Sequence, residues 1–232
     1  IGSGLVGSEM CIRDRNRYNG KDVKVFQPSE SNHGLTNNEI NELCGDKNGR
    51  MYIRSGNDLI KLDIYTEQFT CLRQKGVYGL FCKKDTLWVS CADGIYYYTG
   101  QGTELTFFAR VQKGFVGRAL YVDKETVWVV TRKYLVAISR EDPLRQEILL
   151  TLDKGNCILG DSSGNIWVGA WNGLYRISPN RETTAYVSHS GMGELSDNQV
   201  RCVLEDDFKH IWVGTFKGCL LYTSPSPRDR SL

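Results

Sequence analysis

Residues Asp161–Pro179 read DSSGNIWVGAWNGLYRISP, and this stretch decides the fold. Its centre recurs as HIWVGTFKG at residues 210–218, and looser copies occur at 50–64, 86–100 and 126–140. Aligned on their central aromatic residue, the copies lie 36, 40, 39 and 45 residues apart. A repeat of about 40 residues is typical of proteins in which each copy forms one supersecondary unit. The aligned aromatic residues are Tyr52, Trp88, Trp128, Trp167 and Trp212.

Each copy predicts four short antiparallel strands. An apolar segment ends in an acidic residue, and a turn rich in Asp, Asn and Gly leads into a strand built on Trp-Val. A second turn, a Gly-Leu-Tyr strand and a weaker outer strand follow, all with period-two alternation. Four such strands make one propeller blade. The sequence therefore predicts an all-β fold, a β-propeller fragment of about five four-stranded blades that is incomplete at both ends.

The boundaries of this fragment follow from the same pattern. The inner strands are expected at residues 39–45, 77–83, 117–123, 155–160 and 199–205. Residues 16–31 are expected to supply only the outer strand of a preceding blade, and the last blade is expected to stop at Gly218. The recurring aromatic residues are expected to pack between neighbouring blades, because a buried Trp removes a large apolar area from water. Trp171 has no counterpart in the other copies and is the aromatic residue expected to contact a ligand.

Composition excludes several classes of protein. The 232 residues are 41% hydrophobic and 24% charged, with a net charge of +2, as in an ordinary soluble globular chain. No apolar run approaches the roughly 18 residues of a membrane-spanning helix. The charge is too balanced to indicate nucleic acid or a membrane surface as a partner.

The two ends of the chain differ from its body. Back-translation of Glu9–Arg15 yields a DNA element whose reverse complement encodes residues 219–224 in frame. Such a relationship is typical of translated sequencing-adapter DNA, which must be set aside before the fold is considered. We therefore expect residues 1–15 and 219–232 to be adapter-derived and residues 16–218 to be the genuine partial propeller.

The motif D-x-x-G-N-I-W-V-G-x-x-x-G-L-Y-R-I-S-P, with L-S-x-N-x-V-x-x-x-x-E-D, resembles the two-component regulator propeller repeat. Residues 161–179 and 195–218 carry it best, whereas Tyr52, Ser90 and Val130 depart from it in the other copies. The resemblance implies a ligand sensor in the periplasmic part of a hybrid histidine kinase, often tuned to polysaccharide fragments. It also implies, as partners, the remaining blades and signalling domains of the parent chain, and a parent homodimer.

No catalytic, metal or cofactor site is expected. His33, His189 and His210 cannot converge as a set, and no zinc-binding spacing of His or Cys occurs. Six cysteines of the body lie in predicted strands and are expected to be buried thiols: Cys44, Cys71, Cys82, Cys91, Cys157 and Cys202. Their redox state is left open, because an oxidising periplasm would also permit pairing.

Ligand recognition is expected where the loops between second and third strands meet the outer-to-inner connections. In a four-stranded antiparallel blade both emerge at the same end, and loops there vary while the strands keep packing. Aromatic rings with amide and charged groups suit an oligosaccharide. The expected ligand-binding residues are Arg54, Asn57, Asp93, Arg132, Trp171, Asn172 and Lys217. The alternative is a propeller enzyme of the streptogramin-lyase or quinoprotein type, because fold alone does not decide function.

Overall fold

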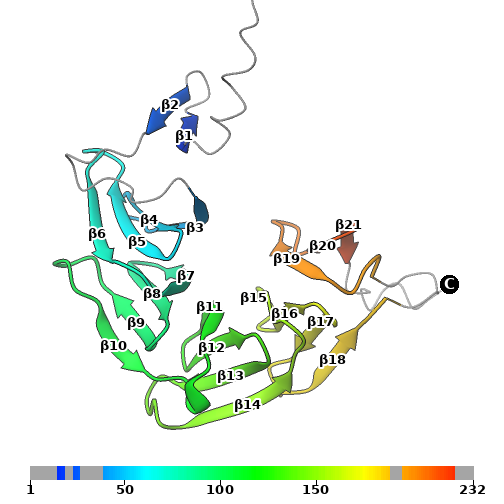
Figure 1. Cartoon of the computed structure of the whole chain (residues 1–232). Coiled ribbons are helices and arrows are strands. Elements are labelled where there is room, and N and C mark those ends of the chain that lie inside the picture. Colours follow the sequence, from blue (N-terminus) through cyan, green and yellow to red (C-terminus); the bar gives the residue numbers. More distant parts are fainter. Residues whose placement is uncertain (1–14, 19–22, 27–38, 189–194, 223–232) are drawn as a thin grey trace, which may run out of the picture. The chain divides into compact units, whose positions relative to one another are not determined.

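The computed structural model describes residues 15–18, 23–26, 39–188 and 195–222 (Figure 1). Within these ranges the chain is built from β-strands, with one short 3₁₀-helix, η2 (Gln112–Gly114). The predicted all-β fold is confirmed, and the sheets have the antiparallel meander order of propeller blades.

Four of the sheets have four strands each. The first contains β3 (Ile40–Gly45), β4 (Arg50–Ser55), β5 (Asp58–Asp63) and β6 (Phe69–Arg73). The second contains β7 (Val77–Lys83), β8 (Thr86–Cys91), β9 (Gly94–Tyr98) and β10 (Thr106–Ala109). The third contains β11 (Gly117–Val122), β12 (Thr126–Thr131), β13 (Tyr134–Ser139) and β14 (Gln146–Thr151). The fourth contains β15 (Cys157–Gly160), β16 (Ile166–Ala170), β17 (Gly173–Ile177) and β18 (Thr183–Tyr186).

A three-stranded sheet follows, formed by β19 (Val200–Glu205), β20 (Ile211–Thr215) and β21 (Gly218–Tyr222). The inner strands β3, β7, β11, β15 and β19 lie within two residues of their predicted positions. Two details of the prediction were wrong. Near the N-terminus, β1 (Arg15–Tyr18) and β2 (Val23–Phe26) form a two-stranded sheet, where a single outer strand was predicted. The last sheet also runs past Gly218, since Cys219–Tyr222 pair with β20.

The chain divides into two compact units, which are described separately. Unit 1 comprises residues 1–92 and 96–107, and unit 2 comprises residues 93–95 and 108–232. In unit 1, the inner strands β3 and β7 lie side by side. In unit 2, β11 lies beside β15 and β15 lies beside β19.

Trp128 and Trp167 fill the layers between neighbouring blades, as predicted, whereas Trp212 of the last sheet is 38% exposed. Trp128 packs against Ile166 and Val168 of the next blade. Trp167, only 2% exposed, packs in the same way against Val200 and Val213. A buried indole contributes much of the apolar area that holds adjacent blades together.

Four of the five recurring rings are also held by an acidic residue. The indole Nε1 of Trp167 donates to Asp161 Oδ2 at 2.8 Å, and Asp161 Oδ1 accepts from the backbone N–H groups of Ser163 and Asn165. The aspartate thus fixes the hairpin turn and satisfies the buried indole N–H together. The same relationship joins Trp128 to Asp123, Trp212 to Asp206 and Tyr52 to Asp46. The Asp and the aromatic residue of the repeat therefore have one shared structural role.

Candidate functional site

A β-bulge re-aims one side chain near the start of four inner strands. The pairing register shifts between the first and third residue of β3, β7, β11 and β19, so the second residue is left out of the ladder. Bulges of this kind turn a side chain away from the regular alternation and are frequent beside binding sites. The four bulge residues are exposed: Asn41, Tyr78, Arg118 and Arg201. They were not predicted as site residues, because the pattern within one strand does not reveal a shift in its pairing register.

The loops at this end of unit 2 are hydrogen bonded to one another. Gly155 N donates to the carbonyl of Arg132 at 3.1 Å, which joins the β14–β15 connection to the β12–β13 loop. Trp171 N donates to Asp153 O at 2.8 Å, and Asn172 Oδ1 accepts from Asp153 N at 3.0 Å. The second-to-third loops and the outer-to-inner connection therefore meet at one end, as the sequence predicts, and their backbones are fixed.

Trp171 lies at the centre of a group of cations. The Lys154 Nζ is 3.5 Å from the centroid of the Trp171 ring, and the Arg201 guanidinium carbon is 5.7 Å from it. Arg201 also lies 5.3 Å from the ring centroid of Phe216, in the β20–β21 loop. Cations are attracted to the faces of aromatic rings. The indole therefore positions positive charge in addition to offering an apolar ring.

Two of the other predicted residues at this end already have internal partners. The Asn172 side chain accepts from Asp153 N, and its Nδ2 donates to Tyr175 Oη at 2.7 Å. Lys217 Nζ lies 3.7 Å from Asp197 Oδ2. Asn172 thus positions the Trp171 loop, whereas Arg132 is exposed and directs its charge to solvent.

Arg54 was predicted to lie in a loop, and this was wrong. It belongs to β4 of unit 1, and its Nε lies 3.3 Å from Glu42 Oε2 on β3. Glu42 also accepts from Leu80 N at 3.1 Å. Burial raises the pKa of Glu42 above its ordinary value, and Arg54 opposes that rise. Arg54 therefore stabilises a half-buried carboxylate inside unit 1.

The remaining two predicted residues lie in short turns. Asn57 is exposed in the β4–β5 turn, and its carbonyl accepts from Val77 N at 3.0 Å. Asp93 is exposed in the β8–β9 turn. The structure thus brings Arg132, Trp171 and Asn172 together in unit 2, while Arg54 and Asn57 lie in unit 1.

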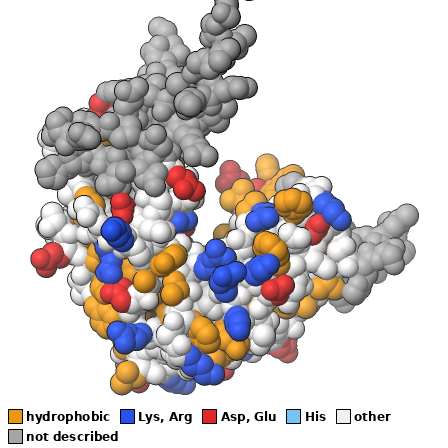
Figure 2. Space-filling view, in the orientation of Figure 1, with side chains coloured by type: hydrophobic (Ala, Val, Ile, Leu, Met, Phe, Trp, Pro, Cys, Tyr) orange, Lys and Arg blue, Asp and Glu red, His pale blue; other side chains and the backbone are white. Residues whose placement is uncertain are grey.

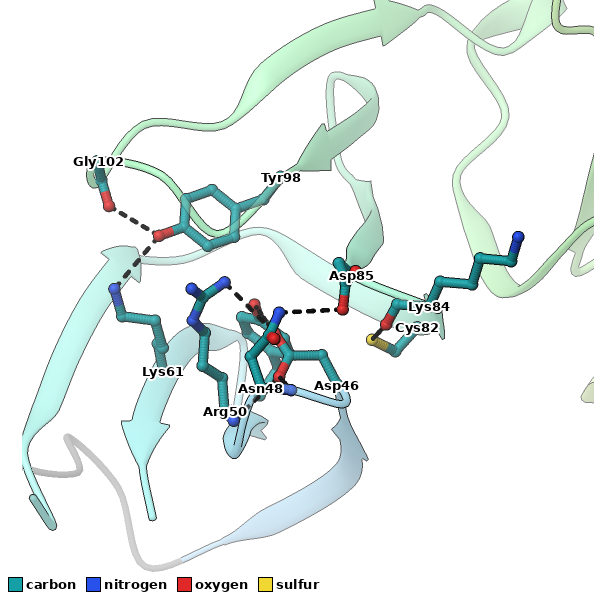
Figure 3. A network of polar contacts seen from close by, with 10 residues as sticks. Asp46, Asn48, Arg50, Lys61, Cys82, Lys84, Asp85, Tyr98 and Gly102 are labelled. Atoms are coloured by element: carbon teal, nitrogen blue, oxygen red, sulfur yellow. Dashed lines mark hydrogen bonds and ion pairs between the residues drawn. The ribbon is translucent and has the colours of Figure 1, made fainter. Parts of the chain in front are cut away.

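The opposite ends of the blades carry structural contacts. Figure 3 shows this end of unit 1, where Asn48 Nδ2 donates to Asp85 Oδ1 at 3.0 Å and so joins the first two blades. In unit 2 a hollow of about 350 Å³ lies at this end, and the Arg181 guanidinium lies 5.0 Å from the ring centroid of Trp128 in its lining. The turns between the first and second strands of the blades therefore have a structural role, which agrees with their repetitive sequence.

The cysteines and histidines correct one prediction. Cys91 is buried as predicted, but Cys202 on β19 is exposed. The other four body cysteines are half-buried. His210 Nδ1 lies 3.1 Å from Asp206 Oδ2, whereas His33 and His189 fall outside the described residues. Within the described ranges, no three His, Cys, Asp or Glu side chains are grouped so as to hold a metal ion.

Comparison with known proteins identifies the repeat. Residues 194–217 match the family model described as two component regulator propeller. No curated protein matches the chain. In the described part of the chain, no helix has the length and apolar character needed to span a bilayer.

Solved structures share the fold. The extracellular domain of a protein named as the hybrid two component system BT4673 from B. thetaiotaomicron is 18% identical, with a TM-score of 0.70 over 88% of this chain and 29% of that chain. The corresponding domain of BT3049 from the same organism is 18% identical, with a TM-score of 0.65 over 90% and 37%. Virginiamycin B lyase from Staphylococcus aureus is 12% identical, with a TM-score of 0.59 over 81% and 71%. The chain thus spans less than two fifths of the two extracellular domains, and these likenesses show a propeller fold.

Proposed function

We propose that this chain, which carries a two-component regulator propeller repeat within a propeller fold, is the ligand-sensing segment of a two-component signalling receptor. It recognises a saccharide or a partner protein and has no catalysis of its own. The segment lies in the periplasm, and its partners are further blades and signalling domains of a homodimeric parent chain. The observation that carries the proposal is the cluster of loops around Trp171, whose backbones are hydrogen bonded while their side chains differ from blade to blade.

A fixed loop frame with variable side chains suits recognition. Loops on a rigid scaffold carry binding residues because substitutions there leave the packed strands intact. The cluster offers an indole, exposed guanidinium groups and the exposed Phe216 ring. Rings cover the apolar face of a sugar, while charged groups bond its hydroxyls.

The test is saccharide binding by calorimetry with Trp171→Ala and Arg132→Ala. We expect both substitutions to lower the affinity at least tenfold while the fold stays intact. Lys124→Ala is the matched control, since Lys124 is an exposed cation of the same blade at the opposite end. Undiminished affinity in both loop variants would remove this end from consideration. Turnover of a streptogramin by the purified chain would instead support the enzyme alternative.

A further inference from the structure

We propose that the ligand at this end of unit 2 is an anionic saccharide, whose carboxylate or sulfate groups bind a cationic band formed by Arg132, Lys154 and Arg201 around Trp171. This inference rests on the proposed sensing function and names its ligand class. Figure 2 shows several Lys and Arg side chains gathered close together on the visible face of unit 2.

The segments that carry the band are brought together by the fold. Arg132 accepts through its carbonyl from Gly155 N, so the β12–β13 loop lies against the residue that follows Lys154. Lys154 and Arg201 both lie within 6 Å of the centroid of the Trp171 ring, at 3.5 and 5.7 Å. The indole attracts both cations, so positive charge gathers around it where an anionic group could bind.

The bulge that presents Arg201 is held by the neighbouring blade. Asn156 Nδ2 donates to the carbonyls of Val200 and Arg201, at 3.2 and 3.0 Å. The main chain on both sides of the bulge is therefore tied to the residue before β15. A preorganised guanidinium loses less freedom when it binds an anion, which favours affinity.

The three cations of the band have no acidic partner among the described residues, so none of their charge is neutralised by an ion pair there. Arg50, Arg54, Arg181 and Lys217 each lie within 4 Å of a carboxylate. Across residues 39–188 and 195–218, no carboxylate forms an ion pair with Lys154, and the same holds for Arg132 and Arg201. Hydrogen bonds from cations to anionic acceptors are the strong ones, so this group is available for a charged ligand.

The aromatic residues of the band favour a saccharide over a small anion. The exposed Phe216 ring lies beside Arg201, and the Trp171 ring lies within 6 Å of both Lys154 and Arg201. A sugar acid or sulfated sugar presents both an apolar ring face and a negative group at a fixed distance from it. Such a ligand uses the rings and the charges together.

The experiment uses calorimetry on the purified chain with four probes. Maltotetraose, sulfated maltotetraose and tetragalacturonate separate neutral, sulfate and carboxylate ligands, and hexaglutamate is an anion without sugar rings. We expect one acidic saccharide, or both, to bind at least tenfold more tightly than maltotetraose, and to weaken as salt rises. Whichever of sulfated maltotetraose and tetragalacturonate binds more tightly identifies sulfate or carboxylate as the preferred anionic group.

Variants assign the binding to the band. Lys154→Gln with Arg201→Gln should weaken the acidic saccharide at least tenfold. Lys124→Gln with Lys209→Gln removes the same net charge from exposed turn residues and should leave the affinity unchanged. The single substitution Arg201→Lys, with Lys154 left unchanged, keeps the positive charge and should retain most of the binding of the acidic saccharide.

Three results would overturn the inference: an acidic saccharide no tighter than maltotetraose, an equal loss in the charge-matched control, or hexaglutamate binding as tight as the acidic saccharides. Neutral binding that depends on Trp171 would leave the sensing proposal standing and remove only the anionic ligand. Binding of hexaglutamate without any saccharide would favour a protein partner.

Discussion

The sulfur of Cys202 lies 2.5 Å from the point at which a Cβ atom on Gly214 would be placed. The two residues are opposite each other on β19 and β20. The same relationship joins Cys157 to Gly169 on β15 and β16, also at 2.5 Å. The glycine of the Trp-Val-Gly motif is therefore required by the size of the side chain across the ladder.

The degenerate copies of the repeat follow the same rule. Where the inner strand has a small residue, the glycine is replaced: Gly79 faces Ser90 and Ala119 faces Val130. In the first blade the position holds the ion pair of Glu42 with Arg54. The two positions vary together because they share one volume.

Gly214→Ala should lower the free energy of unfolding by about 1–3 kcal/mol, because the added methyl overlaps the Cys202 sulfur. Cys202→Ala should restore most of that loss in the double variant. In the other pair, Cys157→Ala should rescue Gly169→Ala less well, since a Cβ on Gly169 also lies 2.6 Å from Val200 Cγ1. Urea denaturation of the four variants measures this, and equal rescue in both pairs would contradict the volume argument.

Trp167→Phe should lower the free energy of unfolding by roughly 2–3 kcal/mol, because it leaves a cavity and leaves Asp161 with one donor fewer. Trp212→Phe is the matched comparison. Trp212 makes the same bond to Asp206 but is 38% exposed, so its loss should be smaller. A larger loss for Trp212→Phe, again by urea denaturation, would show that burial between blades is not the dominant contribution.

Cys202 should react with iodoacetamide well before Cys91, which is 2% exposed, and before Cys157. Burial, with the neighbouring Cys202, raises the pKa of Cys157 to about 12, so little thiolate forms there at neutral pH. Peptide mass spectrometry of partly alkylated protein ranks the three thiols. Early labelling of Cys91 or Cys157 would indicate that the blades separate in solution.

The stability contributed by Glu42 should depend on pH. Burial raises its pKa above the ordinary 4.5, so the folded state holds its proton to a higher pH than the unfolded state. Relative to Glu42→Gln, the free energy of unfolding should therefore fall as pH rises from 4.5 through the folded pKa. Denaturation of both proteins across pH 4–8 measures the difference, and a difference that increases with pH would give Glu42 a lowered pKa instead.

Strand positions could be predicted from the sequence because each copy repeats the same alternation and the same Asp-turn-Trp spacing. The bulges could not, since a register shift depends on pairing between strands rather than on the pattern within one. Arg201 was missed as a site residue for that reason. Arg54 was misplaced because the β4–β5 turn contains only Gly56 and Asn57, so the strand includes both Arg54 and Ser55.

At the candidate site, too, the sequence predicts a single residue, Trp171, but not the contacts that other segments make with it. Its lack of a counterpart in other copies marked it from sequence alone. Its cationic neighbours come from the β14–β15 connection and from β19, which only the fold brings together. A single unusual residue can therefore be found in a repeat, whereas the chemistry of its surroundings cannot.

The bulge position also has a consequence for how propellers of this kind diversify. Asn41, Tyr78, Arg118 and Arg201 occupy equivalent places, yet they differ in charge, size and aromaticity. A residue outside the ladder hydrogen bonds can mutate without disturbing the packing of its blade. Gene duplication of such blades would supply each descendant with independent substitution sites on an unchanged frame. New specificities can then arise by single neutral steps, in one lineage after another, without a loss of foldability.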